Sequence, residues 1–220
     1  MKLNNSHITE LLNYDNSYGC TVIGTDEAGR GSGIGAVFAG AVYFPCINGE
    51  IIEKLSKLND SKQLSKKQRE ELYKIIKLET INSVVSIDVE EIERINILNA
   101  SLKAMKLAVN NVIKQVNKKN LIVLVDGNKL IKNFEYLQKY VIKGDSTSAA
   151  IAGASILAKV ERDNYVTELS KQYPQYGWDR NMGYLTKEHL EAIDKYGITP
   201  LHRKSYLTKH FAKSKQLSLL

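Results

Sequence analysis

The sequence predicts an α/β fold in which a mixed five-stranded sheet is flanked by helices and followed by a C-terminal helical extension. Two apolar runs, residues 21–27 and 36–44, are separated by a glycine-rich turn, which is typical of an antiparallel hairpin. Apolar runs then alternate with helical patterns, as they do in α/β proteins. Residues 121–125 are continuously apolar and mostly β-branched, which indicates a strand buried on both faces.

The other elements follow in order along the chain. Residues 1–20 form an N-terminal lead-in with an apolar helical spacing, and Ser65 with Gln68 forms a capping box that begins a helix. Asn96 begins a long amphipathic helix, and a helix rich in small residues follows the fifth strand. The predicted strands are residues 21–27, 36–44, 83–87, 121–125 and 140–142. The predicted helices are residues 65–77, 96–116, 146–172, 186–196 and 206–216, with a turn or short helix at 88–94.

Length and composition limit the class of protein. A chain of 220 residues makes one large domain, and no run of 18 apolar residues is present to cross a membrane. The N-terminus lacks the apolar region of a signal peptide, and Cys20 and Cys46 are too few for a disulfide framework, so a cytoplasmic protein is expected. The net charge of +7 favours a nucleic-acid partner, although a lysine-rich composition alone also produces such a charge.

The adjacent carboxylates Asp26 and Glu27 end the first predicted strand, just before a glycine-rich turn. Because neighbouring strand residues point to opposite faces, these two side chains can serve one site only if the strand ends or bulges there. Glycines permit such a change of direction and let a ligand approach the bare backbone. The alternative is a charged surface turn without further function.

Two other predicted strands also end near an aspartate beside a glycine, at Asp126 and Asp145. Ligands collect at the carboxyl ends of strands in open α/β sheets, so Asp26, Glu27, Asp126 and Asp145 are expected to converge. Such a cluster suits Mg²⁺ or Mn²⁺, which prefer oxygen ligands. Asp163 follows Asp145 by 18 residues, about 27 Å along a helix, so we assign Asp145 to the cluster and Asp163 to a supporting ion pair with Arg162.

With these stretches identified, the chain closely resembles bacterial ribonuclease HII of the type 2 ribonuclease H family. The type 3 relatives have a different sequence after the Asp-Glu pair. The motifs occur in the family's order over most of the chain. They are DEAGRG at 26–31, DSKQLS at 60–65, INIL at 95–98, VDGN at 125–128, KGDSTSAAIAGASILAKVERD at 143–163, MGY at 182–184 and PLHRKSY at 200–206.

The resemblance implies a ribonuclease H-like fold and a role for each matched position. The four metal-binding and catalytic acids fall on Asp26, Glu27, Asp126 and Asp145, with two divalent ions, Mn²⁺ or Mg²⁺, expected per site. The Gly-Arg-Gly motif that reads a 2′-hydroxyl falls on Gly29, Arg30 and Gly31, and the tyrosine that stacks on the following deoxyribose falls on Tyr184. Leu185, where glycine is usual, and Tyr206, where phenylalanine is usual, depart from the pattern.

The implied activity is endonucleolytic cleavage of RNA in RNA–DNA hybrids and nicking 5′ to ribonucleotides embedded in duplex DNA. Two-metal hydrolysis would leave 5′-phosphate and 3′-hydroxyl ends. The domains are then residues 1–20 as lead-in, 21–172 as catalytic domain and 173–220 as a helical region that contacts substrate. A monomer without membrane contact is expected. The alternatives are another two-metal nuclease of this fold that acts on DNA, and a non-catalytic nucleic-acid-binding module.

Overall fold

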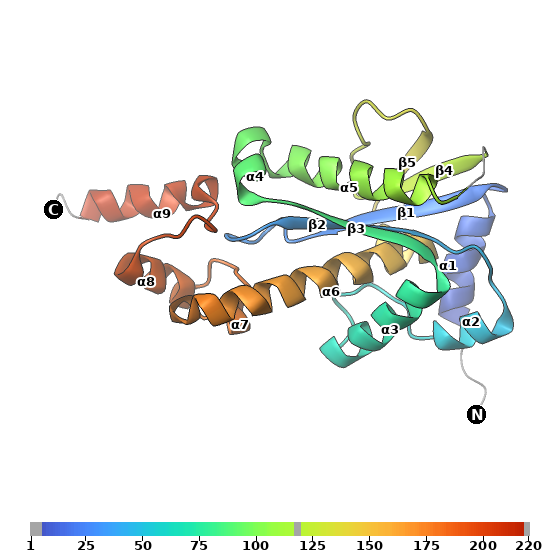
Figure 1. The fold of residues 1–220 in the computed structure, drawn as a ribbon, viewed down its shortest axis with the longest axis horizontal. Coiled ribbons are helices and arrows are strands. Elements are labelled where there is room, and N and C mark those ends of the chain that lie inside the picture. The colour runs from blue at the N-terminus through green and yellow to red at the C-terminus, as the bar shows by residue number, and fades with distance from the viewer. Residues whose placement is uncertain (1–5, 117–119, 218–220) are drawn as a thin grey trace.

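A computed structural model describes residues 6–116 and 120–217 of the chain. A single five-stranded sheet lies between two helical layers, with α5 on one face and α6, α3 and α1 on the other (Figure 1). The strand order is β3-β2-β1-β4-β5, so the predicted mixed sheet is confirmed. The strands are β1 (Thr21–Ala28), β2 (Val37–Tyr43), β3 (Ile81–Ile87), β4 (Leu121–Asp126) and β5 (Leu137–Val141).

The strand pairing brings the carboxyl ends of the central strands together. β1 pairs with β2 in antiparallel fashion, and β1, β4 and β5 run parallel to one another. Thr25 is the register partner of Val125, so the next residues, Asp26 and Asp126, lie at neighbouring positions. Asp126 is in turn the register partner of Val141, the last residue of β5.

The helices agree with the predicted order except at three places. The short helices α2 and α7 were not predicted, and α6 begins at Ala149 rather than at residue 146. A 3-10 turn, Gly144–Ser146, precedes α6 and contains Asp145, which therefore follows β5 by a turn instead of ending the strand. The helices are α1 (Ser6–Asn16), α2 (Gly49–Lys54), α3 (Lys66–Glu79), α4 (Val89–Ile95), α5 (Ile97–Ile113), α6 (Ala149–Gln172), α7 (Trp178–Asn181), α8 (Lys187–Tyr196) and α9 (Lys204–Leu217), with a second 3-10 turn at Pro174–Tyr176.

Close contact between α6 and the sheet depends on two glycines. A Cβ atom on Gly24 of β1 would lie 2.2 Å from the backbone of Ala150, and one on Gly40 of β2 would lie 2.4 Å from the carbonyl oxygen of Ala154. Larger residues at either position would push the helix away from the strands. The small residues of α6 and these glycines therefore let the helix and strand backbones touch.

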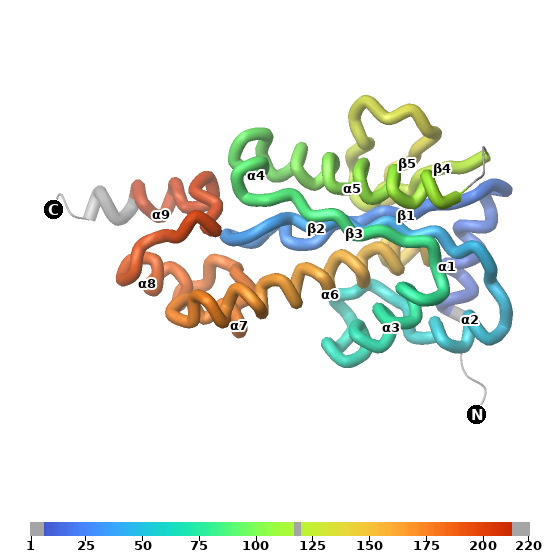
Figure 2. The backbone as a smooth tube through the Cα atoms, in the orientation of Figure 1, coloured from blue at the N-terminus to red at the C-terminus, as the bar shows by residue number. Residues whose placement is uncertain are grey.

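The C-terminal helices form their own apolar core at the end of the molecule opposite α1 and α2 (Figure 2). Val166 and Leu169 of α6 belong to this core, together with Trp178 and Leu207. The boundary at residue 172 stays a prediction, because the last turns of α6 pack with the helices that follow it. Among residues 6–116 and 120–217, no helix is long and apolar enough to cross a membrane.

Asp15 of α1 ties the N-terminal helix to α6. Its Oδ2 accepts a hydrogen bond of 2.9 Å from the N–H of Ala150, and only 7% of the residue is exposed. Burial raises the pKa of the Asp15 carboxyl from 3.8 to about 6, against the opposing hydrogen bonds from Ser148 and the start of α6. Because the folded-state pKa lies above the ordinary value, the group adds stability at pH values below 3.8, and this contribution is lost as the pH rises through about 6.

Asp15→Asn is therefore expected to raise the Tm relative to wild type at pH 8 and to change it little at pH 4. The amide can still accept the hydrogen bond from Ala150 but carries no charge to bury. Thermal unfolding of both proteins across this pH range measures the difference. A gap in Tm that stays constant with pH would contradict the assigned cause.

Candidate active site

Asp26 of β1 and Asp126 of β4 lie side by side at the carboxyl ends of two parallel strands. The Oδ1 atom of Asp126 accepts a 2.7 Å hydrogen bond from the N–H of Gly144. This bond draws the turn before α6, with Asp145 in it, toward the same edge of the sheet. The main-chain path of three elements thus brings these aspartates to one place.

The carboxylates at this edge raise one another's proton affinity. Burial, and then the charges of Glu27 and Asp126, hold the pKa of Asp26 well above its ordinary value. Burial also raises the pKa of Glu27, with Asp126 adding to the rise and Arg30 opposing it. The pKa of Asp145 is raised by burial, by Asp60 and by Asp126. The charge of Asp126 therefore acts on all three other predicted acids.

Asp26 and Glu27 reach this edge of the sheet from opposite faces of β1. An end or a bulge of the strand was expected at Asp26 and Glu27. β1 has neither, because its pairing with β2 continues to Ala28 opposite Phe38. Successive residues therefore face opposite sides. Asp26 faces Ser155 of α6, and Glu27 lines a cavity of about 130 Å³ with residues of α5. Within the described parts of the chain, no three acidic, histidine or cysteine side chains already stand close enough to hold a metal ion.

The donor set nevertheless fits a hard divalent cation. It consists of carboxylate oxygens alone, and burial next to like charges makes the ionised state of Asp26, Glu27 and Asp145 costly. A cation relieves this repulsion, and oxygen ligands are those that Mg²⁺ and Mn²⁺ prefer. Small side-chain rotations about fixed strand ends would complete such a site.

Sequence reasoning missed the segment between α2 and α3 as part of this site. The Lys62 ammonium lies 3.7 Å from Oδ2 of Asp145 and is also attracted by Asp26 and Asp126. The Ser61 and Ser155 hydroxyls lie 2.9 Å apart, and Ser155 also bonds to Asp26. The available signal was the DSKQLS motif at 60–65, which supported the family resemblance but was assigned no role at the site.

A buried arginine fixes the glycine-rich turn after β1 through hydrogen bonds to its backbone carbonyls. Arg203 is fully buried, and its guanidinium donates to the carbonyl oxygens of Gly29 and Gly35 at 2.8 Å each. Gly29 has a φ of +96°, a conformation that glycine adopts without strain. Arg30 projects from this turn, half exposed, and pairs with Glu27 at 3.0 Å.

Tyr184 lies directly against this turn. A Cβ atom on Gly31 would be 3.3 Å from the Tyr184 ring, and the guanidinium of Arg162 lies 5.7 Å from the ring centroid. The side chain is 44% exposed, so one face of the ring stays available to a ligand. The two sequence motifs that resemble substrate-reading elements therefore lie in contact, although about 150 residues separate them.

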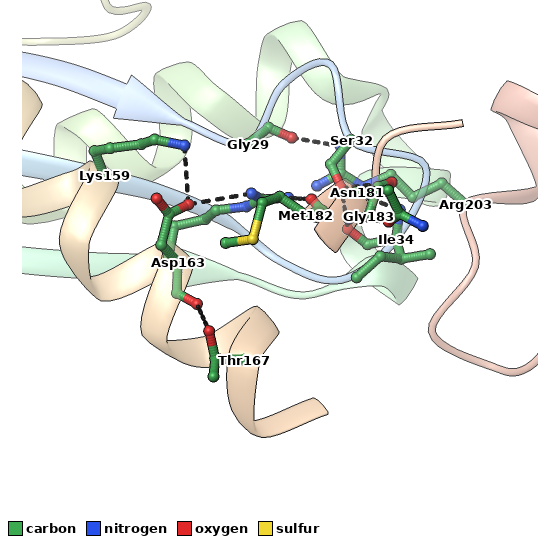
Figure 3. Close-up of polar contacts among 11 residues, drawn as sticks. Gly29, Ser32, Ile34, Lys159, Asp163, Thr167, Asn181, Met182, Gly183 and Arg203 are labelled. Carbon is green, nitrogen blue, oxygen red and sulfur yellow. Dashed lines mark hydrogen bonds and ion pairs between the residues drawn. The ribbon is translucent and has the colours of Figure 1, made fainter. Parts of the chain in front are cut away.

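Asp163 lies apart from the acid cluster and supports the Tyr184 loop instead. It accepts hydrogen bonds from Lys159 at 2.9 Å and from Arg162 at 3.3 Å (Figure 3). Arg162 also donates to the carbonyl of Met182, two residues before Tyr184. The predicted ion pair between Asp163 and Arg162 is present.

Two of the departures from the family pattern, Leu185 and Tyr206, are accommodated by local packing. A Cβ atom on Gly33 would lie 2.5 Å from the Leu185 side chain, so the leucine rests on a glycine of the turn. Tyr206 donates its hydroxyl hydrogen to the carbonyl of Arg30. Both residues thus add contacts between the C-terminal region and the glycine-rich turn.

Comparison with known proteins places the chain in one family. The family model described as Ribonuclease HII matches residues 23–211. A Ribonuclease HII of Pelagibacter ubique is 51% identical over 83% of this chain and 94% of its own length. A Ribonuclease HII of Fusobacterium nucleatum is 46% identical over 90% of this chain and 91% of its own length.

Solved structures agree on the fold. The crystal structure of ribonuclease H2 from Pyrococcus horikoshii has a TM-score of 0.65 and 27% identity, and the match covers 84% of this chain and 93% of that one. Bst-RNase HIII in complex with Mn²⁺ has a TM-score of 0.66 over 84% of this chain and 66% of that chain, at 17% identity. This second likeness concerns the fold alone.

Proposed function

The chain belongs to the ribonuclease HII family and is an endoribonuclease that acts on RNA–DNA hybrids, and from this premise we propose which of its residues perform the reaction. The proposal includes nicking of duplex DNA 5′ to single embedded ribonucleotides. Cleavage leaves a 5′-phosphate and a 3′-hydroxyl end.

Asp26, Glu27, Asp126 and Asp145 would hold two divalent cations, Mg²⁺ or Mn²⁺. When bound, such ions supply a water-derived nucleophile and stabilise the leaving 3′ oxygen. The protein's own part is to fix the carboxylates at the strand ends, where the hydrogen bond from the Ser155 hydroxyl opposes part of the rise in the pKa of Asp26. The Mn²⁺ found with Bst-RNase HIII makes Mn²⁺ one of the ions to test here.

Gly29, Arg30 and Gly31 would contact the 2′-hydroxyl of the ribonucleotide through their backbone. The 2′-hydroxyl is the group that distinguishes RNA from DNA at a single position. Tyr184 would stack on the next deoxyribose. The contact between the Tyr184 ring and Gly31 supports this division of roles, since the ring and the turn at residues 29–31 would then reach adjacent nucleotides.

The observation that carries the proposed site is the charge coupling of Asp126 to Asp26, Glu27 and Asp145. The test is cleavage of a duplex with one embedded ribonucleotide, with Mg²⁺, with Mn²⁺ and with a chelator. A continuous RNA–DNA hybrid and an all-DNA duplex complete the set. We expect cation-dependent cleavage of the first two substrates only. Cleavage of the all-DNA duplex would favour the alternative, a DNA nuclease of the same fold.

The exposed lysines of α9 are expected to contact phosphates. Replacing Lys204 and Lys209 by alanine should reduce the slope of log affinity against log salt by about one unit for each lost contact. Binding to the single-ribonucleotide duplex, measured in chelator at several salt concentrations, gives this slope. Lys114→Ala, at an exposed position beyond the far end of α5, is the control and should leave the slope unchanged. Equal slopes for all three proteins would show that α9 does not touch the backbone.

A truncation after Tyr206 is not a clean test of this segment. Lys209 is exposed, as expected for a solvated basic residue, but Leu207 is fully buried and His210 bonds to Asp194 at 2.7 Å. Removing the segment would open the C-terminal core. Point substitutions are therefore the cleaner test, and Lys213 and Lys215 have side chains outside the described set.

A further inference from the structure

A buried cluster of two histidines and a tryptophan lies within the C-terminal core, away from the acidic residues. His189 of α8, His202 of the following loop and Trp178 of α7 are each at most 1% exposed. The two imidazole centroids are 5.3 Å apart. Buried histidines need a defined hydrogen-bond partner for each ring nitrogen.

The partners of His189 determine where its proton lies. The indole N–H of Trp178 points to Nε2 of His189 at 3.0 Å. Because an indole nitrogen is only a donor, Nε2 must accept and the proton is on Nδ1. Nδ1 then donates to the carbonyl oxygen of Tyr184 at 3.0 Å.

His202 has the opposite tautomer. Its Nδ1 lies 2.9 Å from the backbone N–H of Thr199, which is only a donor, so the proton is on Nε2. That Nε2–H faces Nε2 of His189 at 3.2 Å, where it shares the single lone pair of this nitrogen with the Trp178 N–H. Burial lowers the pKa of His189, and burial together with His189 lowers the pKa of His202 to about 4. Both rings are therefore neutral at neutral pH, as this hydrogen-bond chain requires.

The backbone at Tyr184 is anchored at three successive carbonyl groups. Met182 accepts from Arg162 of α6, Gly183 accepts from the N–H of Gly33 at 2.9 Å, and Tyr184 accepts from His189 (Figure 3 shows the first two residues). The Tyr184 carbonyl also accepts from the nearby N–H of Thr186 at 2.8 Å. His189 is thus the side-chain anchor of the residue that carries the exposed ring.

His202 also links this anchor to the glycine-rich turn. The next residue, Arg203, donates to the carbonyls of Gly29 and Gly35. His202 therefore bonds to His189, which supports Tyr184, and its neighbour Arg203 bonds to the turn. This dipeptide therefore joins the support of Tyr184 to the turn, in addition to the direct bonds from Gly33 and Ser32 to the carbonyl of Gly183.

We propose that His189 and His202 are positioning residues that hold the Tyr184 ring in register with the turn at residues 29–31, and so set the preference for a single embedded ribonucleotide over a continuous hybrid. This inference rests on the proposed function of both elements. A single ribonucleotide offers one 2′-hydroxyl followed by one deoxyribose, so both readers must engage adjacent nucleotides at once. A continuous hybrid offers a ribose at every position and needs less exact register.

Two substitutions at His189 separate this role from packing. In His189→Asn the amide nitrogen takes the place of Nδ1, so the bond to Tyr184 is kept and the bond from Trp178 is lost. In His189→Gln the amide reaches the place of Nε2, so the bond from Trp178 is kept and the bond to Tyr184 is lost. We expect the glutamine variant to lose about ten- to a hundredfold in kcat/KM on the single-ribonucleotide duplex, with a smaller loss on the hybrid. The asparagine variant keeps the wild-type ratio between the substrates.

The His189 variant with the lower Tm is not expected to be the variant with the lower substrate selectivity. The asparagine variant, which leaves the Trp178 N–H unpaired in the core, should have the lower Tm. A purely structural role would make the less stable variant also the less selective one. That result, or an equal loss on both substrates in the glutamine variant, would overturn the proposal.

A double-mutant cycle tests whether the effect passes through Tyr184. In a Tyr184→Ala background, His189→Gln should change the substrate ratio no further. Additive effects would show that His189 acts elsewhere. Hydrogen exchange of the Tyr184 amide, measured by NMR, provides a readout without catalysis, and should be faster in His189→Gln than in His189→Asn. Equal exchange rates would also overturn the proposal, whereas a wild-type protein that cleaves neither substrate would overturn the proposed function instead.

Discussion

Asp126→Asn is expected to leave the fold intact and to remove nearly all cleavage of both ribonucleotide-containing substrates. The amide keeps the size of the carboxylate and can still accept the hydrogen bond from Gly144. It removes a negative charge that acts on Asp26, Glu27 and Asp145 together. The loss should therefore be several orders of magnitude in kcat at saturating Mg²⁺ or Mn²⁺.

Asp163→Asn is the matched control for this substitution. Asp163 bonds to Lys159 and Arg162 rather than to the acid cluster, so the change should lower the Tm and reduce activity only moderately. Steady-state kinetics and thermal unfolding of both variants make the comparison. Wild-type turnover in Asp126→Asn would show that the strand ends do not form the catalytic centre. If Asp163→Asn is folded but inactive while Asp145→Asn is active, the roles assigned to these two residues must be exchanged.

Tyr184→Ala is expected to reduce cleavage at a single embedded ribonucleotide by about ten- to a hundredfold. Loss of a stacking contact typically costs about 1–3 kcal/mol, and each 1.4 kcal/mol corresponds to about a factor of ten in rate. The ring is 44% exposed and rests on Gly31 and Arg162, so its removal should change the Tm little. Tyr184→Phe keeps the aromatic face and should restore most of the activity.

The decisive quantity is the ratio of turnover on the single-ribonucleotide duplex to turnover on a continuous hybrid. Tyr196→Ala is a suitable control, because Tyr196 is another half-exposed tyrosine of the C-terminal region and lies outside the Tyr184 loop. Its removal should leave the ratio unchanged. If Tyr184→Ala instead lowers both rates equally and also lowers the Tm, the ring serves only packing.

Much of the fold follows from local patterns. The apolar run at 121–125 is β4, a central strand with residues buried on both faces, and Ser65 with Gln68 caps α3 as predicted. These features depend on residues a few positions apart, and their physical causes act over the same short range. The short helices α2 and α7 were missed because helices of six and four residues carry too little periodicity to detect.

Local patterns misplaced two boundaries near the site. The glycines after Glu27 suggested that the strand ends at the carboxylates, but pairing with β2 carries it to Ala28. The helix expected from residue 146 begins at Ala149, because Asp145 lies in a 3-10 turn and Ser148 caps α6 by accepting from the N–H of Ile151. At the first boundary, pairing with another strand overrode the local preference, whereas the second boundary is set by the local cap at Ser148.

By itself, the sequence determined the type of sheet and placed Asp26 and Asp126 near the carboxyl ends of their strands. The spacing of apolar residues identifies the strands, and the direction of the chain identifies their carboxyl ends. Only the tertiary structure decided which side chains support them. Lys62 comes within 3.7 Å of Asp145, and Arg203 bonds to the backbone carbonyls of Gly29 and Gly35, which lie far away in the chain. Such contacts join residues with no fixed sequence spacing, and their geometry exists only after the helices have packed.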